Sequence, residues 1–203
     1  RQLYVFNTHL QASHSSASFS SAVPSRGGMG YRQLRQQQLA KIRQFVAEAA
    51  RHSGVPWLLA GDFNIDAIAD QAVSDAFGYL LDSMPQESDE YRHMLHVLSG
   101  GRGGVRDLLK ESQGEHVSTR PPRLQFPRKT AYIFKHKYPQ RLDYMFFCDA
   151  ECTRVSAQPR RTELAEFACE AHADGRQYTH LSDHYGIATT LRVENDVCWH
   201  HHA

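Results

Sequence analysis

Short apolar runs alternate with longer polar stretches along this chain, and the runs predict strands. Each run is four to seven residues long and is bounded by polar residues or glycine, which is typical of strands that lie in a core. The predicted strands are 3–8, 55–60, 142–148 and 187–193. Residues 151–157 are expected to pair beside the strand at 142–148, and residues 158–180 to be irregular.

Apolar positions at helical spacing predict a long helix over residues 31–51, with Arg, Gln and Lys on its other face. The apolar positions are Leu34, Leu39, Ile42, Phe45, Val46 and Ala49. Shorter helices are predicted over 67–81 and 90–98. The Ser- and Gly-rich stretch 11–30 and the proline-containing stretch 112–140 are expected to be loops. Strands separated by helices and long loops indicate a layered α/β or α+β domain.

Composition narrows the class of protein only slightly. The chain has 203 residues, 41% of them hydrophobic, which suits one globular domain with a sizeable core. A net charge of +1 gives no support for binding to nucleic acid through phosphate charge alone. No apolar run reaches the length of a membrane-spanning helix. The spacing of Cys148, Cys152, Cys169 and Cys198 fits no zinc motif, and a disulfide is expected only if the protein is secreted.

Four short polar clusters lie at or near the ends of the predicted strands. The clusters contain Thr8-His9-Leu10, Gly61-Asp62-Phe63-Asn64, Leu142-Asp143-Tyr144 and Ser182-Asp183-His184. Each has an ordinary explanation when taken alone: a satisfied core histidine, an Asx turn before a helix, a buried acid, or a polar surface turn. Together they point to chemistry, because carboxylate, amide and imidazole groups are those that bind divalent cations and move protons.

Spacing within the clusters suggests how some of these side chains are arranged. Asp62 and Asn64 are two residues apart, so extended backbone places both on one face. Asp143 interrupts an apolar strand, and a buried carboxylate needs a cationic or hydrogen-bonded partner. Arg141 is nearby in sequence, but His184 of the fourth cluster is taken as the better candidate.

The order and spacing of the four clusters resemble the endonuclease/exonuclease/phosphatase superfamily, over roughly Leu3 to Val193. The resemblance implies a DNase I-like fold of two facing, mostly antiparallel β-sheets flanked by helices. It also implies metal-dependent phosphodiester hydrolysis, with Mg²⁺ or another divalent cation such as Mn²⁺ as cofactor.

The resemblance assigns catalytic roles to five residues. His9 would stabilise the phosphoryl transition state, Asp62 would orient or deprotonate the attacking water, and Asn64 would hold the phosphate. Asp143 would pair with His184, which would act as general acid or base or as a metal ligand. The metal-binding residues that the resemblance implies are Asp62, Asn64, Asp183 and His184.

One departure from the family pattern concerns the first strands, which in the family supply an Asn and a metal-binding Glu. This chain begins at the strand that carries His9, so we expect the N-terminal part of the domain to be missing. We therefore expect residues 1–195 to form the C-terminal portion of a single domain, followed by a tail at 196–203. The chain alone is expected to bind magnesium weakly and to turn over poorly.

Flanking sequence favours neutral sphingomyelinases, which cleave sphingomyelin in a membrane surface to ceramide and phosphocholine. The supporting stretches are Thr8-His9-Leu10-Gln11-Ala12, the helix segment 35–42 and the segment 133–140 that leads into Leu142. Phe126-Pro127-Arg128-Lys129 is similar to a loop of animal members, which makes Lys129 a candidate phosphate contact. The resemblance favours a secreted or membrane-associated protein, and no stable protein partner is expected.

Two other functions stay open. Abasic-site endonucleases share the Leu-Asp-Tyr sequence, so a DNA endonuclease or exonuclease is the alternative, and only then would nucleic acid be a partner. Basic residues from Arg120 to Lys137 could contact DNA or lipid headgroups, or form a solvated loop. The chain could also be a degenerate member that only binds, although the six intact polar residues of the clusters speak against this.

Overall fold

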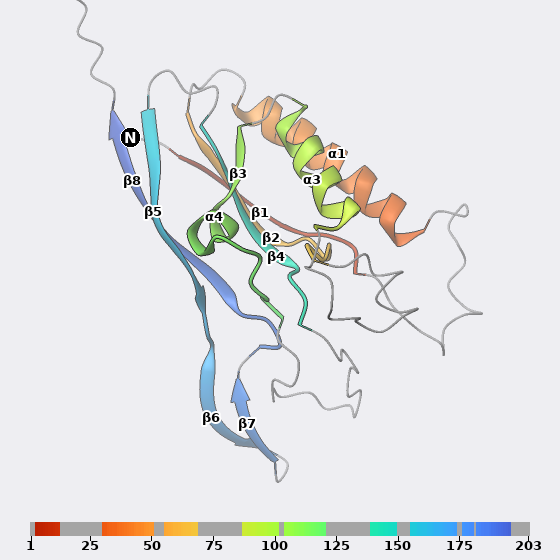
Figure 1. The fold of residues 1–203 in the computed structure, drawn as a ribbon, viewed down its shortest axis with the longest axis vertical. Helices are drawn as coiled ribbons and strands as arrows, with labels where there is room; N and C mark the ends of the chain where they lie inside the picture. The colour runs from red at the N-terminus through yellow and green to blue at the C-terminus, as the bar shows by residue number, and fades with distance from the viewer. Residues whose placement is uncertain are drawn as a thin grey trace, which may run out of the picture.

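A mixed four-stranded sheet forms the centre of the computed structural model, which describes residues 3–12, 30–50, 55–68, 87–101, 104–120, 139–149, 155–173, 176–180 and 182–195 (Figure 1). Its strands are β1 (Tyr4–His9), β2 (Trp57–Asp62), β3 (Val105–Asp107) and β4 (Asp143–Cys148), in the order β1-β2-β4-β3. β1 and β2 are parallel, and the other two pairs are antiparallel.

Alternate side chains of the sheet are buried against different layers, because successive residues of a strand point to opposite faces. Helices α1 (Tyr31–Ala50) and α3 (Asp89–Ser99) cover one face, where Leu59 and Phe146 pack against Leu39 and Met94. Leu58 and Phe147 face the other way, toward Leu108 of α4 (Leu108–Gln113) and Leu191 of β8 (Gly186–Asn195). The core is therefore divided between the two faces of one sheet.

The second face is covered by an antiparallel ribbon in which β5 (Val155–Ala165) pairs with β8. β6 (Ala168–Ala173) and β7 (Arg176–His180) extend from it as a separate hairpin, seen at the lower end of the molecule in Figure 1. The predicted architecture of two facing, mostly antiparallel sheets flanked by helices is confirmed.

Two predictions about the C-terminal third were wrong. Residues 151–157 were expected beside β4, but the described part of this segment, in β5, pairs with β8 instead. Residues 158–180, expected to be irregular, contain most of β5 and the β6–β7 hairpin. The register of β5 shifts between Pro159 and Arg161. Proline and a bulge interrupt the alternation that would otherwise identify a strand from sequence.

The predicted helix over 31–51 is confirmed as α1, and Leu39 and Val46 of its expected apolar face are buried, but two positions differ from the prediction. Phe45 is 61% exposed, whereas Arg35 is buried. The helix predicted over 90–98 is confirmed as α3. The Ser88 hydroxyl accepts a hydrogen bond from Tyr91 N–H at its start, and Gly100 ends it in the left-handed conformation.

Some sequence predictions fall outside the described residues. These are most of the helix predicted over 67–81, nearly all of the loop at 11–30, and the central part of the loop at 112–140.

β3 and α4 were not predicted, since both are short. Within the described ranges, no helix combines the length and the apolar character needed to cross a membrane.

Candidate active site

Three of the predicted site residues lie side by side because three neighbouring strands meet one edge of the sheet. In the strand register, His9 is opposite Asp62, and Asp62 is opposite Asp143. β1 and β2 end at this edge, whereas antiparallel β4 begins there. His9 and Asp62, which are 53 positions apart in sequence, therefore become neighbours, as do Asp62 and Asp143, which are 81 positions apart. The sheet topology therefore brings together the first three sequence clusters.

Asp62 and Asp143 are held particularly close by the type of backbone pairing between their strands. Phe63 N–H donates to the Leu142 carbonyl at 2.9 Å, which makes Asp62 and Asp143 a non-hydrogen-bonded pair. In such pairs the Cα atoms are about 4.5 Å apart and the side chains approach closely. Burial, together with the charge of Asp143, raises the pKa of Asp62 above its ordinary value.

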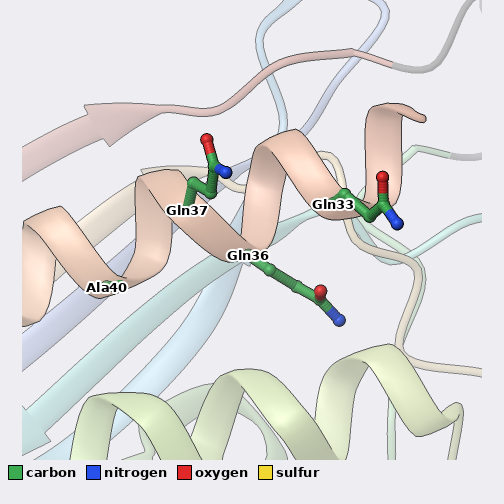
Figure 2. A pocket seen from close by; sticks show the side chains of 4 residues that line it. All are labelled: Gln33, Gln36, Gln37 and Ala40. Atoms are coloured by element: carbon green, nitrogen blue, oxygen red, sulfur yellow. The ribbon is translucent and has the colours of Figure 1, made fainter. Parts of the chain in front are cut away.

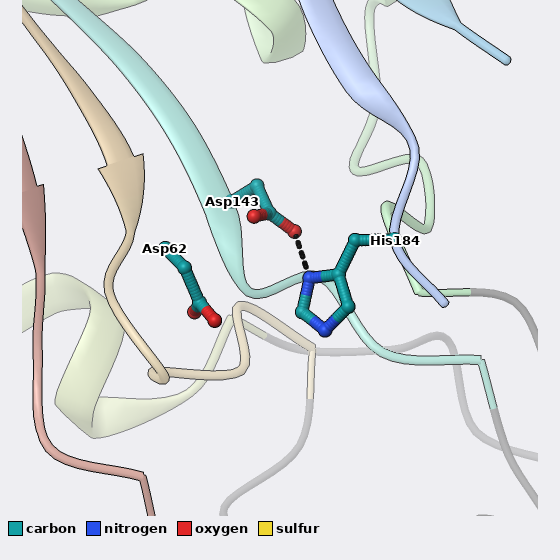
Figure 3. A group of neighbouring side chains, drawn as sticks. All are labelled: Asp62, Asp143 and His184. Carbon is teal, nitrogen blue, oxygen red and sulfur yellow. Dashed lines mark hydrogen bonds and ion pairs between the residues drawn. The ribbon is translucent and has the colours of Figure 1, made fainter. Parts of the chain in front are cut away.

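His184 completes the group from the loop that precedes β8, and Figure 3 shows its ring directed at Asp143. His184 Nδ1 lies 2.8 Å from Asp143 Oδ2, which is the partner that the sequence predicted for this buried acid. Burial alone would lower the pKa of His184, but the bond and charge of Asp143 outweigh it and leave the pKa raised. With Nδ1 bound, Nε2 is the ring atom left to act on a substrate or an ion.

A divalent cation fits the chemistry of this group. Asp62, Asp143 and His184 each offer one ligand atom, and these atoms lie within 4.8 Å of one another. Two carboxylates this close repel each other, as the raised pKa of Asp62 indicates, and a cation between them would relieve the repulsion. The geometric group contains Asp62 and His184 of the expected ligand set, with Asp143 in place of Asn64 and Asp183.

Asp62 accepts from Asn64 in an Asx turn, which was one of the two possible explanations of this cluster from sequence. The Asn64 backbone N–H donates to Asp62 Oδ1 at 2.8 Å, and the Asn64 side-chain amide donates to the Leu10 carbonyl at 3.0 Å. The backbone of Asn64 has a positive φ of 51°. Gly61 precedes this turn, and only glycine fits there, because a Cβ at this position would lie 1.8 Å from the Thr8 carbonyl oxygen.

Asp183 and His9 lie at the margin of the group. Asp183 Oδ2 is 3.2 Å from the Arg120 guanidinium, so Asp183 and His184 have different partners, as expected from sequence. The His9 side chain is 72% exposed, and its Nε2 lies 3.5 Å from Asp62 Oδ2. Lys129 lies outside the described residues, so its predicted phosphate contact stays a prediction.

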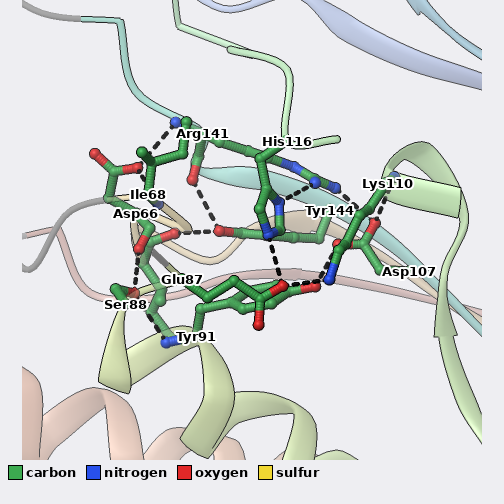
Figure 4. A network of polar contacts seen from close by, with 11 residues as sticks. Asp66, Ile68, Glu87, Ser88, Tyr91, Asp107, Lys110, His116, Arg141 and Tyr144 are labelled. Atoms are coloured by element: carbon green, nitrogen blue, oxygen red, sulfur yellow. Dashed lines mark hydrogen bonds and ion pairs between the residues drawn. The ribbon is translucent and has the colours of Figure 1, made fainter. Parts of the chain in front are cut away.

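Buried polar groups that the sequence did not identify support the start of β4 (Figure 4). Arg141 is fully buried and bonds to Asp107 at 2.6 Å and to His116 at 2.6 Å. Its guanidinium lies over the Tyr144 ring, 4.9 Å from the centroid. The Tyr144 hydroxyl donates to the carbonyls of Ile65 and Arg141, at 2.6 and 2.8 Å. This network fixes the backbone on both sides of Asp143.

Two shallow hollows lie along α1. One is lined by Gln33, Gln36, Gln37 and Ala40 (Figure 2). The other lies between α1 and the end of β1 and includes His9. Neither of these two hollows is lined by Asp62, Asp143 or His184.

A comparison of the sequence with known protein families identifies the class of protein to which this fold and site belong. Residues 3–184 match the model of the Endonuclease/Exonuclease/phosphatase family, and the chain belongs to this family. A sphingomyelinase of Dictyostelium discoideum is 22% identical over an alignment of 240 residues, which covers 94% of this chain and 50% of the relative. The chain thus spans about half the length of the curated relative that it matches.

Solved structures show the same fold at low sequence identity. A beta toxin of Staphylococcus aureus superposes with a TM-score of 0.56 at 20% identity, covering 94% of this chain and 53% of the toxin. A form of that toxin with bound magnesium ions gives 0.51 at 22% identity, covering 91% and 51%. A 3'-5' exonuclease of Neisseria meningitidis gives 0.50 at 19% identity, covering 92% and 60%. The predicted family and the similarity to a sphingomyelinase are confirmed.

Proposed function

We propose that this chain carries part of the active site of a magnesium-dependent phosphodiesterase that hydrolyses sphingomyelin to ceramide and phosphocholine. The observation that carries the proposal is the group formed by Asp62, Asp143 and His184 at the sheet edge. Family membership supports metal-dependent hydrolysis at this group. The curated sphingomyelinase relative supports the choice of substrate.

The side chains of the group can divide the reaction between them. Water attacks phosphorus, and the Asp62 carboxylate, which lies between His9 and Asp143 at the sheet edge, accepts its proton. The bond from phosphorus to the ceramide oxygen breaks, and a proton must reach that oxygen. His184 is the candidate donor, because Asp143 raises its pKa and orients its ring.

A bound Mg²⁺ would neutralise phosphoryl charge and lower the pKa of water. Asp62 and Asp143 are the described carboxylates that would hold it, which leaves His184 Nε2 to carry the proton. Asp183, Asn64 and His9 flank them, and we propose that they contact the ion's water or the phosphoryl oxygens. A secreted or membrane-associated location would follow from a lipid substrate, and it belongs to this proposal.

A nuclease is the second candidate, because the Neisseria exonuclease shares the fold. The test that separates the candidates is a substrate panel given to the full-length protein with magnesium or with EDTA. The panel consists of sphingomyelin vesicles, abasic-site DNA and an inositol polyphosphate. We expect phosphocholine release from the vesicles only, and only with magnesium. Cleavage of DNA alone would establish the nuclease, and binding to vesicles without any product would indicate a non-catalytic module.

A matched pair of substitutions connects the activity to the site. Asp62→Asn removes the carboxylate that accepts the proton, and we expect a loss of about 100-fold or more in kcat. Asp89→Asn makes the same change at an exposed position in the first turn of α3. It should leave the rate unchanged. Equal effects of the two substitutions would place the chemistry elsewhere.

A further inference from the structure

Thr119 lies at the junction between the two segments that supply Asp143 and His184. It is fully buried, with no exposed surface. It belongs to none of the four sequence clusters and precedes Arg120, which forms an antiparallel bridge with Gln140. Its side chain bonds to one of the two segments and its backbone bonds to the other.

The side chain of Thr119 binds the start of β4. Its Oγ1 accepts hydrogen bonds from the N–H groups of Leu142 and Asp143, each at 3.1 Å. β3 ends at Asp107, opposite Phe146, so it does not reach this end of β4. The hydroxyl oxygen therefore accepts the hydrogen bonds that a neighbouring strand would otherwise accept, from two consecutive backbone N–H groups.

The backbone of Thr119 binds the loop that carries His184. Tyr185 N–H donates to the Thr119 carbonyl at 2.7 Å, which is short for a backbone bond. The neighbouring Arg120 pairs with Asp183 at 3.2 Å. Bonds from residues 119 and 120 thus reach the residues on both sides of His184.

We propose that Thr119 is the positioning residue for the Asp143–His184 pair. Thr119 does not touch either reacting side chain. Its side chain bonds to the Asp143 backbone, and its carbonyl bonds to the backbone of Tyr185, next to His184. It thereby sets the separation across which the bond from His184 Nδ1 to Asp143 forms. The proposal deepens the proposed function and rests on it for the catalytic consequence, while the effect on the histidine can be measured independently.

The test compares Thr119→Val with Thr119→Ser in the full-length protein. Valine keeps the shape and loses the acceptor oxygen, whereas serine keeps that oxygen. Thr162→Val is the matched control, because Thr162 is also buried, at 2% exposed. Its hydroxyl lies 2.8 Å from the Thr189 hydroxyl in the β5–β8 ribbon. All three variants are compared at equal temperature below their thermal unfolding midpoints.

Two measurements separate positioning from general stability. The first is kcat and KM for sphingomyelin vesicles with magnesium. The second is the proton NMR resonance of His184 Nδ1–H in the metal-free protein at one fixed pH, assigned by its loss in His184→Gln. A proton bonded to a carboxylate appears far downfield, so this resonance reports the Asp143–His184 bond directly.

We expect Thr119→Val to lower kcat by about 10- to 100-fold with little change in KM, as for residues that orient a reactive group. The downfield resonance should weaken or disappear. Thr119→Ser should restore both, and Thr162→Val should change neither. An unchanged resonance in Thr119→Val would overturn the proposal, as would the same loss in Thr162→Val. If the wild-type protein cleaves no phosphodiester, the proposed function fails, and the resonance still decides the role of Thr119.

Discussion

The buried ion pair between α1 and α3 gives a quantitative test of how this structure is held together. Arg35 Nε and Nη2 donate to the two carboxylate oxygens of Glu90 at 2.7 and 2.9 Å. The side chains are only 3% and 7% exposed. Arg35 Nη1 also donates to the Gln11 carbonyl at 3.3 Å, two residues beyond His9. The pair therefore connects both helices to the segment that follows β1.

Removing one partner should destabilise the protein far more than removing both. Arg35→Met leaves the Glu90 carboxylate buried without its cation, and Glu90→Leu leaves the guanidinium without its anion. Each should lower the free energy of unfolding by about 3–5 kcal/mol. The double variant removes both charges and keeps apolar volume. It also loses the bond to the Gln11 carbonyl, so it should lie within about 1 kcal/mol of wild type or above it.

Urea denaturation followed by circular dichroism measures these differences, provided that the m-value is the same for all variants. Arg92→Met is the control, because Arg92 pairs with Asp89 on the exposed face of α3, where the side chains are 55% and 66% exposed. It should change the free energy of unfolding by less than about 1 kcal/mol. Additive single effects, or a double variant about 6 kcal/mol less stable than wild type, would refute the reasoning.

Three further predictions concern the site and its support. Asp143→Asn removes the charge that orients His184, and kcat should fall by about 100-fold or more while KM changes little, in steady-state assays. Burial, with help from the Arg141 charge, holds the pKa of His116 below its ordinary value despite a bond to a carboxylate. The stability that neutral His116 contributes is present above its unfolded pKa of 6.5 and is lost as pH falls. His116→Gln should therefore reduce the slope of the unfolding free energy below about pH 6.5, in urea titrations; an unchanged slope would contradict this. Tyr144→Phe removes the hydroxyl bonds to the Ile65 and Arg141 carbonyls; the Arg141 carbonyl keeps its bond from Ala67 N–H, so the cost comes mainly from the Ile65 carbonyl and should be about 1–3 kcal/mol in the same assay, whereas a neutral effect would show that another donor replaces the hydroxyl.

The sequence could predict the site residues because each of them follows from a local rule. His9 and Asp62 follow apolar runs, so they lie at the ends of neighbouring strands, of which β2 is buried in its first half and β1 alternates between half-buried and exposed residues. Asp143 interrupts an apolar run, and the cost of burying its charge predicts a partner such as His184. Gly61 and Asn64 are turn-forming residues, and both have positive φ values in the structure.

The parts that could not be predicted depend on contacts between distant segments. Arg35 occupies a helix position that periodicity assigns to the polar face, and its partner Glu90 is 55 residues away on another helix. Phe45 has the spacing of a core residue but remains exposed. The pairing of β5 with β8 depends on cross-strand register and not on alternation within β5. Thr119 lies in a polar stretch where no pattern distinguishes it from its neighbours.

We expect the bond-breaking step and the choice of substrate to depend on different parts of the chain. Asp62 and Asp143 are fixed by strand register, so family members with the same sheet can present the same carboxylates to different phosphodiesters. The residues on either side of 121–138 are joined by the bridge between Arg120 and Gln140. Arg120 itself contacts Asp183. Lys129 is the candidate phosphate contact from sequence, and losing a contact made equally in the ground and transition states raises KM with kcat unchanged, so Lys129→Ala should raise KM more than it lowers kcat in steady-state assays.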